Sequence, residues 1–323
     1  MKAAIYKKYG PPEVVQVMDV PKPEPKHDEV RIKVHASTVN RTDCGFRSAN
    51  YFIVRFFSGL FRPKRPTLGC EFSGVIDSVG TAVTNFQPGD KVFGFDDHLF
   101  GGHAEYMILP STAAIVKMPS GISFEEAACI SEGAHYALFY IRAAHIGPGT
   151  TMVINGATGA IGSAGVQLCV HMGAHVTAVC ETKHVDLVKS LGADAIIDYT
   201  QQDFTQLDQL FDVVFDSVGK SNFGKCKRIL KKKGIYMSSE LGPRYENPFL
   251  AIYTPWFGGK KVLFPMPSTK LDDIKFLKEL VESGKYKPVI DRMYPLEKIV
   301  DAYHYVETGM KTGNVVIQVA PVN

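Results

Sequence analysis

The 323-residue chain lacks the cysteine patterns of a metal site or a disulfide framework: its six cysteines are scattered, with no C-x-x-C pair and no Cys/His cluster. Such usage is typical of a reduced, cytoplasmic protein. The N-terminus has no apolar signal-peptide core, and no uninterrupted apolar run approaches the length of a membrane span. We therefore expect a soluble, cytoplasmic protein.

A continuous excess of one charge is also missing. The chain has 36 Lys and Arg against 33 Asp and Glu, a net charge of +3, and the run Lys231 to Lys233 forms a short cluster that we expect at a solvated helix end. Nucleic-acid binding needs a basic face, so we expect no nucleic-acid partner. The 45% hydrophobic content and the length predict a globular protein with two domains.

The most informative stretch runs from Thr150 to Thr182. A β-branched and apolar run, Thr151 to Ile154, is followed by glycines at G-x-x-G-x-x-G spacing and by a helical pattern from Ile161 to Met172. A second strand-like run, His175 to Cys180, closes a unit of about 30 residues, the size of half a dinucleotide-binding fold. Glycines let the backbone approach a pyrophosphate, and the helix N-terminus presents unpaired N–H groups to it. A glycine-rich turn in an unrelated α/β protein is the alternative.

The remaining chain divides into two styles of sequence. Residues 1–122 carry short β-like runs between dense Pro and Gly, which indicates a compact antiparallel barrel or sandwich. Residues 123–285 alternate strands and helices, which predicts a doubly wound parallel sheet, and residues 286–323 return to the first style. We expect a discontinuous catalytic domain with a nucleotide domain inserted, and a ligand cleft between them.

The sequence patterns predict individual elements as follows. In the first domain the expected strands are Ala3–Tyr6, Val14–Val17, Val30–Ala36, Gly74–Val79, Lys91–Phe95 and Ala104–Leu109. A helix capped by Ser123 leads to the glycine turn, and a helix opened by Ser268 and Thr269 covers Leu271–Ser283. Between them we expect helices at Val185–Leu191, Phe204–Leu210 and up to Leu230, and strands at Ala195–Asp198, Val213–Asp216, Ile235–Ser238 and Lys261–Phe264. A helix Glu297–Glu307 and a strand Val315–Val319 end the chain.

Several stretches together resemble the medium-chain dehydrogenase/reductase superfamily, and within it the zinc-independent quinone and enone oxidoreductases. They are Val34–Asp43, Leu68–Ile76, Phe86–Gly94, the glycine turn, Leu191–Tyr199 and Lys311–Val319. The resemblance covers essentially the whole chain and implies a Rossmann domain inserted in a GroES-like catalytic domain. At the positions that resemble two zinc ligands of the zinc-dependent relatives stand Asn40 and Cys70, which implies that no metal is bound.

The resemblance implies NADPH-dependent reduction of quinones or α,β-unsaturated ketones and aldehydes, by hydride transfer without a metal, to a small apolar electron acceptor. It also implies a homodimer that forms through the strand Lys261–Phe264. The alternatives are a non-enzymatic NAD(P)H-binding protein, crystallin-like or touching RNA, and an alcohol-dehydrogenase-type activity on small substrates. The aromatic segment Tyr51–Phe61 could wall an apolar substrate pocket, form a dimer contact or touch a membrane surface.

Three residues are catalytic candidates, Asn40 and Asp43 by the resemblance and Tyr51 as the nearest phenol downstream of them. Asn40 and Asp43 lie on the loop expected to face the nicotinamide, where Asn40 could donate to a substrate oxygen; alternatively, both only fix their own loop. Tyr51 could donate a proton, although packing would also explain it.

The cofactor candidates form a longer set. Cys180 stands where NAD-preferring relatives place an acid, and Thr182 and Lys183 follow where a 2′-phosphate would lie, so NADPH is favoured over NADH. The nearby Glu181 is evidence against this preference, because its negative charge would repel a phosphate. The full set of expected cofactor residues is Gly156, Thr158, Gly159, Ala160, Ile161, Cys180, Thr182, Lys183, Tyr199, Ser217, Val218, Phe264 and Asn314.

Overall fold

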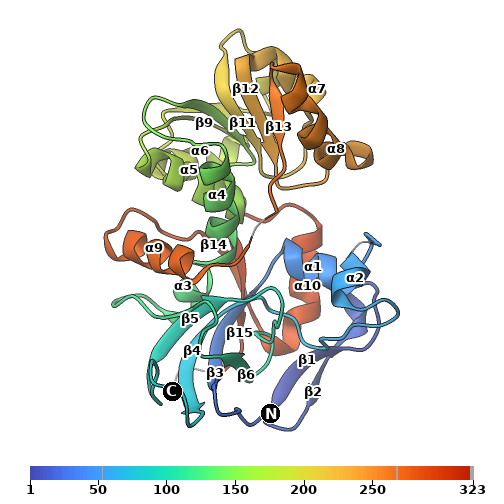
Figure 1. Cartoon of the computed structure of the whole chain (residues 1–323), viewed down its shortest axis with the longest axis vertical. Helices are drawn as coiled ribbons and strands as arrows, with labels where there is room; N and C mark the ends of the chain where they lie inside the picture. The colour runs from blue at the N-terminus through green and yellow to red at the C-terminus, as the bar shows by residue number, and fades with distance from the viewer. Residues whose placement is uncertain (53, 267, 321–323) are drawn as a thin grey trace. The chain divides into compact units, whose positions relative to one another are not determined.

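The computed structural model describes residues 1–52, 54–266 and 268–320, which form two compact units (Figure 1). The β-rich unit comprises residues 1–132, 269–283 and the chain from 288 onward, and the parallel-sheet unit comprises residues 133–268 and 284–287. Residues 123–132 and 269–283, which the sequence-based boundaries assign to the nucleotide domain, pack with the β-rich unit. The predicted boundaries of the catalytic and nucleotide domains stay a prediction.

The β-rich unit contains a hairpin and a larger, mostly antiparallel sheet. The hairpin pairs β1 (Lys2–Tyr6) with β2 (Val15–Asp19). The larger sheet has the order β14-β15-β3-β4-β5-β7, with β6 also paired to β3, and only its β14–β15 pair is parallel among the described residues. Its strands are β3 (Glu29–Val39), β4 (Glu71–Val79), β5 (Lys91–Phe95), β6 (Tyr106–Pro110), β7 (Ile115–Lys117), β14 (Ile290–Pro295) and β15 (Asn314–Gln318).

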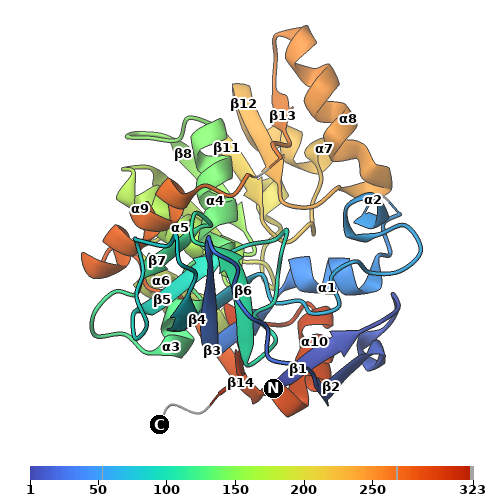
Figure 2. The same cartoon turned by 60° about the horizontal axis from the view of Figure 1, so that its bottom comes forward.

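Helices border this sheet. They are α1 (Arg41–Ser48), α2 (Val54–Ser58), α3 (Phe124–Ala128), α9 (Leu271–Glu282) and α10 (Ile299–Glu307). Helix α10 packs against β3 and β15 through an apolar face at helical spacing, with Ile299, Tyr303 and Val306 fully buried. Figure 2 shows α1 and α10 beside the hairpin of β1 and β2. This packing fixes the position of α1, whose first turn follows Asn40.

The parallel-sheet unit has six strands in the order β10-β9-β8-β11-β12-β13, and every pair is parallel. The strands are β8 (Thr151–Asn155), β9 (His175–Cys180), β10 (Ala195–Asp198), β11 (Phe211–Asp216), β12 (Leu230–Ser238) and β13 (Lys261–Leu263). The helices are α4 (Glu132–Ala143), which starts at the end of the β-rich unit, α5 (Ala160–His171), α6 (Val185–Ser190), α7 (Phe223–Cys226) and α8 (Glu246–Tyr253). The two sheets confirm the predicted fold class.

Most predicted elements are present, and the exceptions have local causes. The strands expected in the first domain are all found within a few residues of their predicted bounds. Ser123 caps α3 in a capping box with Glu126, but the helix that was expected to continue from there breaks at residues 129–131 before α4. No helix in the described part of the chain has the length and apolarity to cross a membrane.

One helix prediction was wrong, and two others differ from the structure in detail. At Phe204–Leu210 only a short 3₁₀ turn forms. The helix expected to reach Leu230 is present as α7 followed by a 3₁₀ turn, Lys227–Ile229. Leu230 then begins β12 and pairs with β11, so the lysine run lies in a strand and not at a helix end. Helix α9 is preceded by Lys270 without a side-chain cap, and the Thr269 hydroxyl donates to Asp97 instead, at 3.4 Å.

Candidate cofactor and active site

The glycine turn follows β8 directly, at the carboxyl edge of the parallel sheet. Gly156 has φ +81°, and Gly159 is the N-cap of α5 and makes no side-chain cap bond. The backbone N–H of Ala157 donates to the carbonyl of Val179 at 3.1 Å, so the turn lies beside the end of β9. The first-turn N–H groups of α5 have no capping side chain, which leaves them available to an anion.

Crowding explains two of the three glycines. A Cβ on Gly156 would lie 2.3 Å from Val218 Cγ1, and a Cβ on Gly162 would lie 2.1 Å from the Gly156 carbonyl oxygen. A Cβ on Gly159, in contrast, would meet only that same oxygen, at 3.7 Å. Protein crowding therefore does not require Gly159, whereas a pyrophosphate lying against the turn would. The turn fits a dinucleotide.

Residues that follow the neighbouring strand β11 hold the glycine turn in place. Ser217, which follows β11, donates its hydroxyl to the Asn155 carbonyl at 2.8 Å, and the Asn155 amide donates to Asp216 at 3.0 Å. Val218 packs on Gly156. The structure thus brings Ser217 and Val218 together with the glycine turn, as a nucleotide site at the ends of neighbouring parallel strands requires. Thr158 and Ile161 are partly exposed in the same turn.

The end of β9 carries the charges that would face the adenosine ribose. Cys180 is buried, which raises the pKa of its thiol to about 11. Lys183 pairs with Glu181 at 3.0 Å, and the Thr182 hydroxyl donates to Asp198, which ends β10 beside Cys180. Hydrogen bonds from Thr182 and Thr200 hold the pKa of Asp198 below its usual value, so it is ionised near neutral pH.

Three further cofactor candidates are distant from the turn in sequence. Tyr199 is more than half exposed just after β10, and its backbone N–H donates to the Cys180 carbonyl at 3.0 Å. Phe264 follows β13 and is partly exposed. Asn314 is buried in the β-rich unit, where its amide donates to the Val289 carbonyl at 3.0 Å.

In the β-rich unit, Asn40 and Asp43 form a reciprocal capping box at the start of α1. The Asn40 side chain accepts from the Asp43 backbone N–H at 3.0 Å, and Asp43 accepts from Asn40 at 3.2 Å and from the Gly69 N–H at 2.9 Å. Burial raises the pKa of Asp43 to about 7 against these hydrogen bonds. Both residues thus stabilise the start of α1, and the catalytic role of Asn40 stays a prediction.

The Asn40 amide also faces the Cys70 sulfur, at 3.1 Å, and the Thr38 hydroxyl, at 3.5 Å. Burial raises the pKa of the Cys70 thiol well above its usual value. A catalytic zinc needs three protein ligands drawn from Cys, His and carboxylate side chains, and the asparagine amide at position 40 is not one of these. Within the described residues, no three His, Cys, Asp or Glu side chains are placed to hold a metal ion. The residues present do not fit a catalytic zinc.

A buried carboxylate pair lies next to this loop, and sequence reasoning missed it. Glu71 accepts from the Thr38 hydroxyl at 2.6 Å and from the Glu132 backbone N–H at 2.8 Å, while Glu132 accepts from the Thr42 hydroxyl at 3.1 Å. Burial is the main cause that raises the pKa of Glu71 to about 8 and that of Glu132 to about 7. Desolvation lowers the pKa of the nearby Lys311, whose positive charge opposes the rise at Glu132. The pair holds protons near neutral pH.

The signals for the missed residues were present but weak. Glu71 is a lone acid in an apolar run, and Glu132 stands among small and apolar residues, which is unusual for an exposed helix. Asp198 ends a predicted strand and could have been placed beside Cys180 from the adjacency of parallel strand ends. Tyr51, the third catalytic candidate, lies just before α2 and is 43% exposed.

Comparison with known proteins identifies the family. The model "Alcohol dehydrogenase GroES-like domain" matches residues 26–120, and "Zinc-binding dehydrogenase" matches residues 191–317. The chain is 33% identical to 2-methylene-furan-3-one reductase of Solanum lycopersicum, over 99% of this chain and 80% of that one. The chain belongs to the medium-chain dehydrogenase/reductase family.

Further relatives place this family member in the quinone and enone oxidoreductase branch, as predicted. An NADPH-dependent alkenal/one oxidoreductase, chloroplastic, of Arabidopsis thaliana is 32% identical over 99% of this chain and 80% of that one. A structure of the quinone oxidoreductase from Coxiella burnetii superposes with a TM-score of 0.87 and 27% identity, over 99% of both chains. The chain is thus an oxidoreductase of a family that binds NAD(P)H.

Proposed function

We propose that this chain reduces α,β-unsaturated ketones and aldehydes, or quinones, with NADPH and without a metal. The observation that carries the proposal is the glycine turn, which lies at the carboxyl ends of β8, β9 and β11 beside an uncapped helix N-terminus. The names of the relatives in Solanum lycopersicum and Arabidopsis thaliana support the substrate class.

The chain's own residues would bind and orient the reactants. The amides of the α5 N-terminus would hold the pyrophosphate, and Ser217 would keep the turn in place through the Asn155 carbonyl. When bound, the dihydronicotinamide supplies the hydride. Hydride transfer to an enone places negative charge on the carbonyl oxygen, so a neutral donor near that oxygen lowers the barrier.

We propose Asn40 as this donor. Its amide protons have only weak bonds, to sulfur at 3.1 Å and to a hydroxyl at 3.5 Å, which a developing enolate oxygen would outcompete. Asp43 would act as a positioning residue, because its carboxylate holds the Asn40 loop. Proton donation by Tyr51 stays a prediction.

We propose NADPH over NADH. Cys180 leaves the end of β9 without an acid, and a 2′-phosphate would replace Glu181 as the partner of Lys183. Asp198 opposes this choice by its charge, so the preference is expected to be moderate.

We also propose a cytoplasmic homodimer. Strand β13 is at the edge of the parallel sheet, and pairing with a second copy would cover this edge. All six cysteines are free and buried, which suits a reducing compartment. Light scattering after gel filtration would give twice the mass of 35.6 kDa for the dimer.

The activity test is oxidation of NADPH, followed by absorbance, with a panel of alkenals, enones and quinones. We expect turnover with at least one class and none with saturated ketones. Cofactor binding without turnover on the whole panel would contradict the enzymatic proposal and favour a non-enzymatic nucleotide-binding role.

A further inference from the structure

Aromatic side chains crowd the surface around α2 in the β-rich unit. Phe56 is 65% exposed, Phe57 70% and Phe61 88%, and Phe52, at 61%, packs edge-on against Phe56 with ring centroids 5.5 Å apart. Single exposed apolar residues are ordinary, but contiguous large patches mark an interaction site. All four rings belong to one short segment of the chain, and Phe52 and Phe56 are in contact.

The same segment is strongly basic. Residues 44–70 contain five Lys and Arg and no Asp or Glu, although the whole chain is nearly balanced in charge. Arg62, Lys64 and Arg65 follow the aromatic residues, are exposed, and make no ion pair within 4.0 Å in the described part of the chain. Together with the four phenylalanines they define an aromatic–basic surface.

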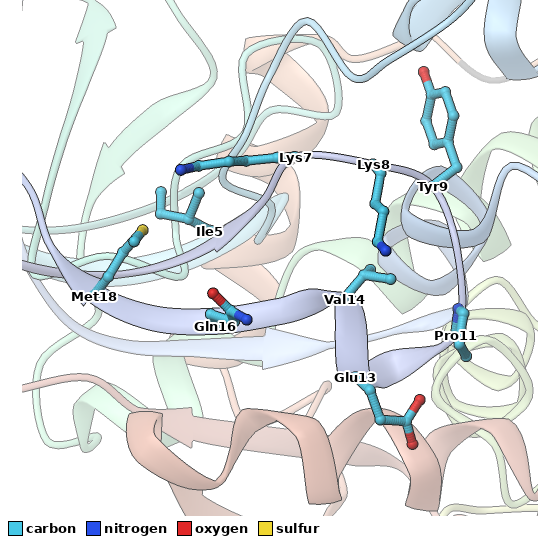
Figure 3. Close-up of a pocket in the computed structure, with 9 residues that line it drawn as sticks. All are labelled: Ile5, Lys7, Lys8, Tyr9, Pro11, Glu13, Val14, Gln16 and Met18. Carbon is cyan, nitrogen blue, oxygen red and sulfur yellow. The ribbon is translucent and has the colours of Figure 1, made fainter.

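The β1–β2 hairpin holds this surface in place. The Tyr9 hydroxyl bonds to Ser58 at 2.7 Å and to the Gly59 carbonyl at 2.6 Å, and the Tyr6 N–H donates to the Pro66 carbonyl at 2.9 Å. Exposed Lys7 and Lys8 lie between these two anchors. In Figure 3, Lys8 extends toward Val14 in a shallow cavity of about 680 Å³, whereas Tyr9 points the opposite way.

We propose that the aromatic–basic surface binds the face of an anionic lipid bilayer. Phenylalanine rings would enter the boundary between headgroups and acyl chains, while the arginines and lysines would remain among the anionic headgroups. A second copy of this chain is a poor occupant, because a two-fold contact would bring the same cations face to face. This inference does not rest on the proposed reductase activity.

The first test uses cosedimentation of the full chain with lipid vesicles. Vesicles of phosphatidylcholine with one third phosphatidylglycerol should bind it, and vesicles of phosphatidylcholine alone should bind at least tenfold more weakly. Combined Phe56→Ser, Phe57→Ser and Phe61→Ser should lower binding by about tenfold for each inserted ring. The matched control, Trp256→Ser with Phe257→Ser, removes exposed aromatics (84% and 80% exposed) from the other unit and should retain binding.

The second test separates charge from apolar contact. Arg62→Glu with Lys64→Glu should weaken binding by at least about 25-fold, since each membrane-facing cation contributes about fivefold. Lys232→Glu with Lys233→Glu changes the net charge equally at another exposed site and should bind like the wild type. All four residues are exposed, so the folded state should persist, which circular dichroism checks.

Binding lost only in the two variants of the aromatic–basic surface supports the proposal. It is overturned if the wild type does not bind anionic vesicles, if the control variants lose binding equally, or if gel filtration shows that the surface joins two copies of the chain and the charge variants separate them.

Discussion

The substitution Gly162→Ala adds one methyl group at the glycine turn and tests whether this turn binds the pyrophosphate of the cofactor. The added Cβ would lie 2.1 Å from the Gly156 carbonyl oxygen and 2.8 Å from Ser217 Oγ. Neither neighbour is the free end of a flexible side chain, because the first is backbone and the second donates to the Asn155 carbonyl. The turn must therefore shift to accept one methyl group.

The magnitude follows from two opposing effects. Overpacking a tight site costs about 1–3 kcal/mol, whereas replacing glycine by alanine within a helix contributes up to about 1 kcal/mol. We expect a net loss of about 1–2 kcal/mol, or a few degrees in Tm. Because the displaced carbonyl belongs to the turn itself, NADPH affinity should fall by at least about tenfold, the effect of one lost hydrogen bond to a charged group.

Gly165→Ala is the control in the same helix. Its Cβ would meet Ile154 and Phe215 at 3.6 Å, an ordinary contact distance. This variant should keep wild-type NADPH affinity and gain about 0.5–1 kcal/mol of stability. Fluorescence titration with NADPH and thermal unfolding measure both. Equal NADPH affinity in the two variants would refute the placement of the pyrophosphate at this turn.

Three other perturbations have defined outcomes. Glu132→Gln should flatten the fall in stability with rising pH, because the buried carboxyl keeps its proton to about pH 7 whereas the unfolded chain releases it near 4.5. The contribution of the protonated carboxyl to stability, up to about 3 kcal/mol, is full below pH 4.5 and is lost as the pH rises through 7. Urea unfolding from pH 4 to 8 measures this fall. An unchanged slope would contradict the assignment. Lys183→Ala should weaken NADPH binding about five- to tenfold and leave NADH unchanged, and equal losses for both would place the 2′-phosphate elsewhere. Asp43→Asn should destabilise the protein by about 1–3 kcal/mol, because its amide group would face the Gly69 or Asn40 N–H, and a wild-type urea midpoint would rule out the capping role.

Patterns with a strict period or a steric cause were predictable from sequence. The glycine turn, β9 and β10 lie where the sequence placed them, because parallel strands are apolar throughout and their bounds are sharp. The run after Phe204 was predicted as a helix because a short apolar periodicity cannot distinguish a helix from a 3₁₀ turn. Lys231–Lys233 were misplaced because β12 pairs with the preceding strand β11 on both sides of them, at Leu230 and from Ile235 onward, and this pairing has no local sequence signal.

The chemistry of the site was only partly predictable. Asn40 and Asp43 were identified by resemblance, but their contacts could not be predicted from the sequence, since Asp43 also accepts from the Gly69 N–H, 26 residues away. The Glu71 and Glu132 pair depends on a contact over 61 residues and on burial, and neither has a local sequence signal. The net charge around Cys180 likewise could not be predicted, because it depends on Asp198, which belongs to the adjacent strand β10.

The central claim is that this chain transfers a hydride from a nicotinamide bound at the glycine turn to an electron-poor carbon. The most direct measurement is reduction of a simple enone with NADPH that carries two deuterium atoms at C4, with mass and NMR analysis of the product. We predict one deuterium at the β-carbon, and its yield should fall for Gly162→Ala but not for Gly165→Ala. A saturated product without that deuterium, or no product while NADPH is bound, would contradict the account.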